Sequence, residues 1–220
     1  SNCDVTGGTN VQTQEIQPVD LPISANQITE WKQAATAGGI NPNDVTYNST
    51  SASLGPIQIG TSSQPKNLTI TNGAYLKVTG TIYVTGNIIF SNNSIIELDN
   101  DIYGSLSGII VADGRVAANN NSILRGSGEE GSYILIISTN SSLDAGAPAI
   151  TVGNNAEGAI FYTTSGLIYL SNNMKAREII GYKIKINNNA EVEYESGLEN
   201  ALFSNGPGGS GIISEWKEIE

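Results

Sequence analysis

The chain has 220 residues, enough for one large all-β domain or for one domain with a small appendage. Only 14% of the residues are charged, compared with about 25% in an average soluble protein, and the net charge is −11. An acidic chain lacks the basic surface that nucleic-acid binding requires, so we exclude this class of partner. The sequence has no histidine, the commonest general base and metal ligand, and the single Cys3 excludes an internal disulfide.

An extended arm and a helix are predicted at the start of the chain. Residues 1–23 are mainly polar and are expected to form the arm. A helix is predicted over residues 24–38, because Ser24 or Asn26 supplies an N-cap and Gly38 supplies a stop. Its apolar face comprises Ile28, Trp31, Ala34 and Ala35.

From residue 45 onward the sequence alternates between apolar and polar residues, as half-buried strands do. Residues 45–47 and 54–59 begin this pattern, and residues 68–98 continue it. Glycines such as Gly80 and Gly86 fit the corners between strands. The side chains expected to stack inside are Ile82, Val84, Ile88, Phe90, Ile168, Leu170, Ile184, Ile186 and Val192.

A short phrase with paired asparagines recurs along the same region. It consists of aliphatic residues, a small polar residue, the asparagines and another apolar run, and a repeat of this kind is typical of a solenoid. Asparagine tolerates the left-handed conformation of turns, and stacked asparagine side chains form hydrogen-bonded ladders. The asparagines assigned to the turns are Asn92, Asn93, Asn120, Asn154, Asn155, Asn172, Asn173, Asn188 and Asn189.

We therefore predict an all-β fold, a right-handed parallel β-helix of about seven coils over residues 45–203. Because such a coil needs a cover at its apolar end, residues 24–44 are expected to form a capping helix and its connection, with Trp31 over the core. Residues 204–220 are expected to form a glycine-rich turn and a final strand that closes or edge-pairs with the coil, with Trp216 as the second capping side chain.

Binding is expected in loops that interrupt the repeat, near residues 99–105 and 126–131. Within the first loop, Asp99 and Asp101 are candidate Ca²⁺ ligands, since oxygen ligands suit this ion. A turn stabilised by aspartate side chains explains the same residues equally well. No other cofactor is predicted.

The sequence offers weak support for catalysis. Many polysaccharide lyases and hydrolases are β-helices, and glycoside hydrolysis needs two carboxylates across a cleft. The clearest strands carry no carboxylate pair at alternating positions, so no catalytic residue is predicted. The candidates considered are the carboxylates Asp99, Asp101, Asp113, Asp144 and Glu157, and the bases Arg115, Arg125, Lys175 and Arg177.

An ordered set of segments carries a family resemblance: ITEWK (28–32), GTIYVTGNI (80–88), GIIVADG (108–114), GSYILIIS (131–138), GAIFY (158–162), GPGGS (206–210) and EWKE (215–218). With these segments, residues 20–220 resemble the extracellular β-helical domain of PilX-like type IV pilus assembly proteins. The resemblance implies an exported domain at the cell surface, whose partners are pilus or envelope proteins, or a surface glycan. It also implies a membrane anchor, an N-terminal hydrophobic helix that this chain does not contain.

The predicted function is therefore structural or adhesive and not enzymatic, within a type IV pilus-like system. One alternative is a carbohydrate-active enzyme of the lyase or hydrolase type, which requires a groove with two carboxylates and a base or Ca²⁺. The other is a bactofilin-like, polymer-forming scaffold. That alternative requires uncapped coil ends, and the predicted helix cap argues against it.

Overall fold

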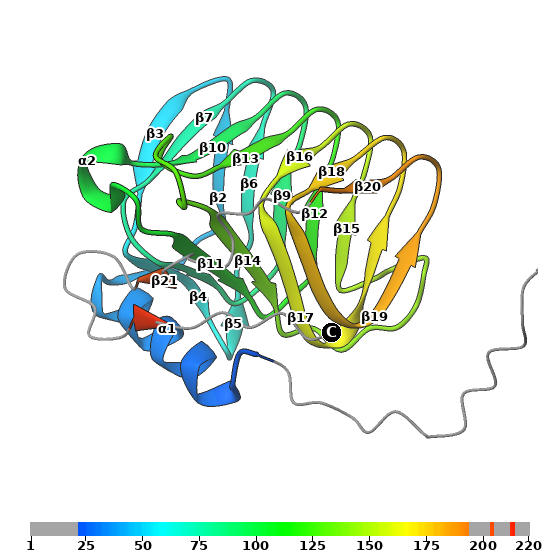
Figure 1. Cartoon of the computed structure of the whole chain (residues 1–220). Helices are drawn as coiled ribbons and strands as arrows, with labels where there is room; N and C mark the ends of the chain where they lie inside the picture. Colours follow the sequence, from blue (N-terminus) through cyan, green and yellow to red (C-terminus); the bar gives the residue numbers. More distant parts are fainter. Residues whose placement is uncertain (1–21, 194–202, 205–211, 214–220) are drawn as a thin grey trace, which may run out of the picture.

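The computed structural model describes residues 22–193, 203–204 and 212–213, and the chain winds into a parallel β-helix (Figure 1). Each winding, or coil, contributes three short strands, and equivalent strands of successive coils pair in parallel. Three faces result. The second face contains seven strands, so the predicted number of about seven coils is confirmed.

The three faces follow one another along every coil (Figure 1). The first face contains β2 (Val45–Asn48), β6 (Leu68–Thr71), β9 (Ile88–Phe90), β12 (Val116–Ala118), β15 (Ile150–Val152) and the second halves of β17 (Ile160–Leu170) and β19 (Glu178–Ile186). The second face contains β3 (Ser51–Leu54), β7 (Tyr75–Val78), β10 (Ile95–Leu98), β13 (Ile123–Arg125), β16 (Glu157–Gly158), β18 (Lys175–Ala176) and β20 (Glu191–Val192).

The third face contains β1 (Ile40–Asn41), β4 (Ile57–Thr61), β8 (Ile82–Val84), β11 (Gly108–Ala112), β14 (Ile134–Ser138) and the first halves of β17 and β19. A short strand, β5 (Gln64–Pro65), pairs antiparallel with β4. Because β17 and β19 each run through the corner from the third face to the first, these two faces form one curled sheet.

Parallel pairing stacks equivalent side chains into columns inside the β-helix. Side chains alternate between the two sides of a strand, and the register keeps each inward position above its equivalent in the previous coil. The expected interior residues from Ile82 to Leu170 are fully buried. Ile184, Ile186 and Val192 belong to the seventh coil, which no later described strand covers, and they are 43%, 59% and 43% exposed.

The asparagine pairs form the corner between the first and second faces. All nine assigned asparagines have φ angles between 47° and 61°, the left-handed conformation expected for them. Side-chain amides of one coil donate to the side-chain oxygens of the previous coil at 2.8–3.4 Å. One ladder runs from Asn48 to Asn188 and a second from Asn93 to Asn189.

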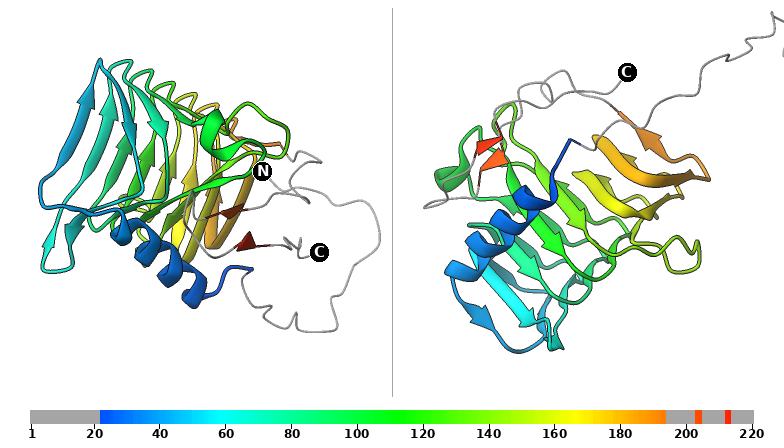
Figure 2. Two further views of the ribbon diagram at one scale, coloured as in Figure 1. Left: turned by 90° about the vertical axis from the view of Figure 1, so that its left-hand side faces the viewer. Right: turned by 90° about the horizontal axis from the view of Figure 1, so that it is seen from below.

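The predicted helix is present, but it lies along the side of the β-helix (Figure 2). α1 (Ala25–Ala37) begins at a capping box in which Ser24 and Gln27 bond to each other's backbone N–H groups. It contacts β4, β8 and β11 of the third face. At its end the backbone approaches the coil so closely that a Cβ atom on Gly38 would lie 2.0 Å from the Pro56 carbonyl oxygen.

The apolar outer surface of the third face explains this position. β11 and β14 are buried at every residue, so both sides of these strands are covered. Trp31 is 3% exposed, and it covers the side of the coil instead of the end predicted for it. The apolar cluster under the helix comprises Ile23, Ile28, Trp31, Ile109, Val111, Leu135, Ile137, Ile160 and Tyr162.

Polar contacts fix the helix on this face. Asp113 accepts hydrogen bonds from Lys32 Nζ and Tyr83 OH, both at 2.5 Å, and from Thr139 Oγ1 at 3.0 Å. Burial, followed by the hydrogen bond to Asp113, raises the pKa of Tyr83. The Tyr162 hydroxyl donates to the Ile23 carbonyl at 2.9 Å, and burial raises its pKa to about 12. Both phenols therefore stay protonated at neutral pH and keep donating.

The described part of the C-terminal region forms a separate pair of strands. β21 (Phe203–Ser204) and β22 (Ile212–Ile213) pair antiparallel with each other, and β21 lies against β11. The strand predicted over residues 212–219 is thus described only at its start, where it pairs with β21 and not with the coil edge. Trp216, Cys3 and most of the predicted arm lie outside the described residues. No helix among the described residues could cross a membrane.

Substitutions at Asn155 separate the two roles of the asparagine corner. Asn155 has a φ of 60°, donates to Asn121 and accepts from Asn173. We expect Asn155→Gly to lower the free energy of unfolding by about 1 kcal/mol, because only the ladder bonds are lost. Asn155→Ala should cost about 1 kcal/mol more, because alanine also disfavours the left-handed backbone. Denaturant unfolding measures both. An equal cost for the two variants would contradict the conformational role.

Removing the Trp31 side chain tests the side-wall role of α1. Trp31→Ala should lower the free energy of unfolding by about 3–5 kcal/mol, since a large buried side chain is lost from an apolar cluster. Gln33→Ala, on the exposed side of the same helix, is the control and should change it by less than about 0.5 kcal/mol. A cost at Trp31 no larger than that of the control would contradict the packing described.

Candidate functional site

Two loops leave the corner between the second and third faces, in neighbouring coils. The first follows β10 and contains α2 (Asn100–Tyr103), and the second joins β13 to β14 over residues 126–133. In the next two coils this corner is tight, because Ala159 alone separates β16 from β17 and Arg177 alone separates β18 from β19. The second loop therefore projects from the surface next to two tight corners, and a hollow lies beside it.

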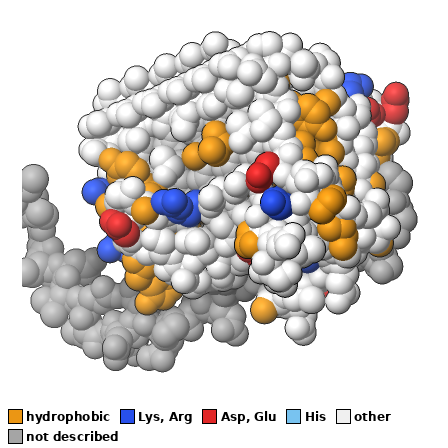
Figure 3. Space-filling model, turned by 180° about the vertical axis from the view of Figure 1, so that it is seen from behind, with side chains coloured by type: hydrophobic (Ala, Val, Ile, Leu, Met, Phe, Trp, Pro, Cys, Tyr) orange, Lys and Arg blue, Asp and Glu red, His pale blue; other side chains and the backbone are white. Residues whose placement is uncertain are grey.

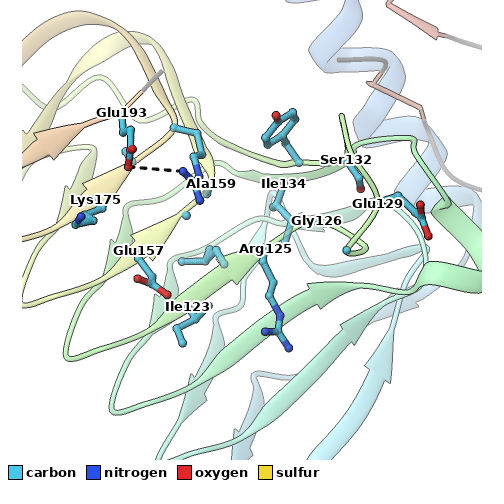
Figure 4. Close-up of a pocket in the computed structure, with 16 residues that line it drawn as sticks. Ile123, Arg125, Gly126, Glu129, Ser132, Ile134, Glu157, Ala159, Lys175 and Glu193 are labelled. Carbon is cyan, nitrogen blue, oxygen red and sulfur yellow. Dashed lines mark ion pairs between the residues drawn. The ribbon is translucent and has the colours of Figure 1, made fainter. Parts of the chain in front are cut away.

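This hollow is a groove of about 600 Å³ (Figure 4). The loop forms one wall with Glu129 and Ser132, and the second face forms the other with Glu157, Lys175 and Glu193. The volume lies within the range of small-molecule sites. Its apolar lining comprises Ile123, Leu124, Ile134, Ala159 and Ala176.

Cations and carboxylates are equal in number among the residues that line the groove. The lining contains three cations and three carboxylates: Arg125, Lys175, Arg177, Glu129, Glu157 and Glu193. All three cations pair with the neighbouring coil. The atoms are Arg125 Nη2 and Glu97 Oε2 at 2.5 Å, Lys175 Nζ and Glu191 Oε2 at 3.2 Å, and Arg177 Nη1 and Glu193 Oε2 at 3.9 Å. Because these cations are exposed, each pair contributes little to stability, about 0–1 kcal/mol.

Hydrogen bonds within the second loop and between the two loops hold the groove wall in place. Ser132 Oγ donates to the Leu106 carbonyl at 2.8 Å and accepts from the Ser127 backbone N–H at 3.0 Å. Asn100 Nδ2 donates to the Ser127 carbonyl at 3.2 Å and to Glu129 Oε1 at 3.3 Å. The two loops predicted as binding positions are therefore stacked, and the first supports the second.

The candidate Ca²⁺ ligands have structural roles in the first loop. Asp99 is the N-cap of α2 and accepts from the Asp101 backbone N–H at 3.0 Å, while its other oxygen pairs with Lys77 Nζ at 3.2 Å. Within the described ranges, no three Asp, Glu, Cys or His side chains are grouped so that they could hold a metal ion. The turn explanation thus accounts for the Asp99 side chain and the Asp101 backbone, and Ca²⁺ binding stays a prediction.

Four of the other residues considered for catalysis line the groove: Glu157, Arg125, Lys175 and Arg177. Asp113 instead fixes α1, and Asp144 accepts from the Gly146 backbone N–H at 2.8 Å within its own loop. Sequence reasoning missed Glu129 and Glu193 as lining residues. The break in the repeat near residue 126 was the available signal for Glu129, whereas Glu193 reaches the groove only through the stacking of coils.

The fold and the groove define a parallel β-helix protein with a polar lateral groove. Charged side chains are sparse on the face shown in Figure 3. No family model, curated protein or solved structure matches the chain. The resemblance to PilX-like proteins therefore stays a prediction from the sequence.

Removing the Ser132 hydroxyl group should loosen the groove wall. In Ser132→Ala the Ser127 N–H loses its acceptor, so we expect its amide hydrogen to exchange at least about tenfold faster, which corresponds to about 1.4 kcal/mol. Ser142→Ala is the control, because Ser142 Oγ donates in a similar way to the Ala147 carbonyl of another loop. Unchanged exchange at residues 126–133 would contradict a supported wall. Site-resolved hydrogen exchange supplies the measurement.

Proposed function

We propose that this chain is a non-enzymatic, exported surface domain with a structural or adhesive role in a type IV pilus-like system, and that it binds a surface glycan in the groove. The pilus assignment and the extracellular location are supported by the sequence resemblance. The glycan assignment is supported by one observation above all: a groove of about 600 Å³ whose lining combines three cations, three carboxylates and apolar side chains.

A glycan fits the chemistry of this lining. Arginine and lysine side chains donate hydrogen bonds, carboxylates accept them, and a hydroxyl group of a sugar does both. Apolar residues such as Ile123 and Ile134 offer contact to the carbon faces of a sugar ring. The hydrogen-bonded loop reduces the conformational entropy lost on binding.

The pairing of the cations favours binding over catalysis. A lyase needs a base that accepts a proton near neutral pH. Arg125 stays protonated in proteins, and it forms hydrogen bonds to Glu97 through both Nε and Nη2. Lys175 and Arg177 are likewise engaged in ion pairs, with Glu191 and Glu193.

A carbohydrate-active enzyme is the second candidate. The groove holds Glu157 and Glu193 together with Lys175 and Arg177, and such a site offers two carboxylates and a cation to a bound polysaccharide. Product formation separates this candidate from an adhesive domain, because both would bind glycans.

Glycan binding without turnover is the expected result. The full chain would be applied to an array of neutral and acidic glycans, and hits would be titrated by calorimetry and checked for cleavage. Lys175→Ala should weaken binding at least tenfold. Lys77→Ala is the matched control, because Lys77 also pairs with a carboxylate at 3.2 Å on the second face but lies outside the groove. Cleavage products would support the enzyme, and binding to no glycan would refute the adhesive role.

A further inference from the structure

At both ends of the β-helix the outermost strands lack a partner on one side among the described residues. β1, β2 and β3 each pair with only one further strand, in the following coil, and β20 and the second half of β19 pair only with the preceding coil. Each end thus presents unpaired backbone N–H and C=O groups, which act as a template for another strand. Because α1 lies along the third face, it covers neither end.

The strand order at one end continues the strand order at the other. The last described strand of the coil, β20, lies on the second face, so the next position in the winding is on the third face. The first strand, β1, lies on the third face and is followed by β2 on the first. In a second copy placed head to tail, β1 would pair with the first half of β19, β2 with its second half and β3 with β20.

Apolar columns continue across such a junction. On the first face, the observed strand register connects Val45 to Ile184 through one paired residue in each coil. On the second face, it connects Ala52 to Val192 in the same way. The next copy would therefore cover the exposed apolar side chains of the seventh coil. The stacked pairs would be Ile184 with Val45, Ile186 with Tyr47, and Val192 with Ala52.

Charges and hydrogen-bond direction agree with the same arrangement. Lys183 precedes Ile184 as Asp44 precedes Val45, so stacking places opposite charges in adjacent layers. Every ladder bond runs from the amide of a later coil to the oxygen of an earlier one. Among the described residues, Asn188 Oδ1 at one end and the Asn48 amide at the other have no hydrogen-bond partner.

The chain's own C-terminal segment is the competing cover for the seventh coil. Residues 194–202 connect this coil to β21, which lies against β11 in the third coil. Four layers separate the two coils, about 19 Å at the usual strand spacing. Because β21 lies this far from the seventh coil, it does not cover that coil.

We infer that copies of this chain assemble head to tail through their coil ends, so that the β-helix continues from one chain into the next. The contact joins two different surfaces and does not close on itself, which gives linear assemblies. The inference does not depend on the proposed glycan binding, because the groove lies on the side of the coil and stays accessible. The predicted helix cap was the argument against a polymer-forming scaffold, but α1 contacts the third face and covers neither end.

Sedimentation of the full chain over about 1 µM to 1 mM tests the inference. The wild type should form species that grow with concentration beyond the dimer, and Ile184→Lys should raise the concentration needed at least tenfold. Ile89→Lys is the matched control, because Ile89 is 39% exposed but lies in the third coil, away from both ends. The control should assemble like the wild type. A wild type that stays monomeric, or an unaffected Ile184→Lys variant, would overturn the inference.

A charge reversal tests the orientation of the copies. Lys183→Glu alone and Asp44→Lys alone should each weaken assembly about fivefold or more, and the double variant should recover most of the loss. Thermal melting of each monomer shows that the variants fold, since Asp44 also accepts the Asn67 backbone N–H at 2.7 Å. Folded single variants that assemble like the wild type, or a double variant without recovery, would refute head-to-tail stacking.

Discussion

The parallel register between successive coils is the constraint on which this structure depends. A single coil of three short strands satisfies few of its own backbone hydrogen bonds and buries little of its apolar surface, so it needs a coil on either side. Register then requires that every coil place the same kind of residue at the same position. Aliphatic columns inside, asparagine ladders at one corner and glycines at close approaches all satisfy this requirement.

The register also explains where the structure departs from regularity. Loops enter only at a corner, because an insertion within a strand would break the columns on both sides. The two loops at the corner between the second and third faces stack on each other, and the groove begins where they end. Paired cations and carboxylates from different coils then meet on one wall, although they are far apart in the sequence. The same geometry leaves the coil ends unpaired, where the repeat stops.

The sequence alone predicts those features of the fold that depend on the residue at a single position. The asparagine phrase predicts the coil and its corner, because left-handed backbone and ladder bonding are properties of single positions. The place of α1 was missed, although a signal was present: the uninterrupted apolar runs of β11 and β14 are typical of strands buried on both sides. The meeting of Arg177 and Glu193 in the groove depends on how coils stack, which spacing alone does not specify.

Coupling between asparagines of adjacent coils tests the register most directly. Asn120 and Asn154 are hydrogen-bonded at 3.1 Å, whereas Asn120 and Asn172 are two coils apart. Glycine substitutions preserve the left-handed backbone, so a double-mutant cycle isolates the side-chain interaction. The account predicts a coupling energy of about 0.5–1 kcal/mol for the first pair and about zero for the second. Coupling absent in the first pair, or equal in both, would contradict stacked ladders as the basis of the fold.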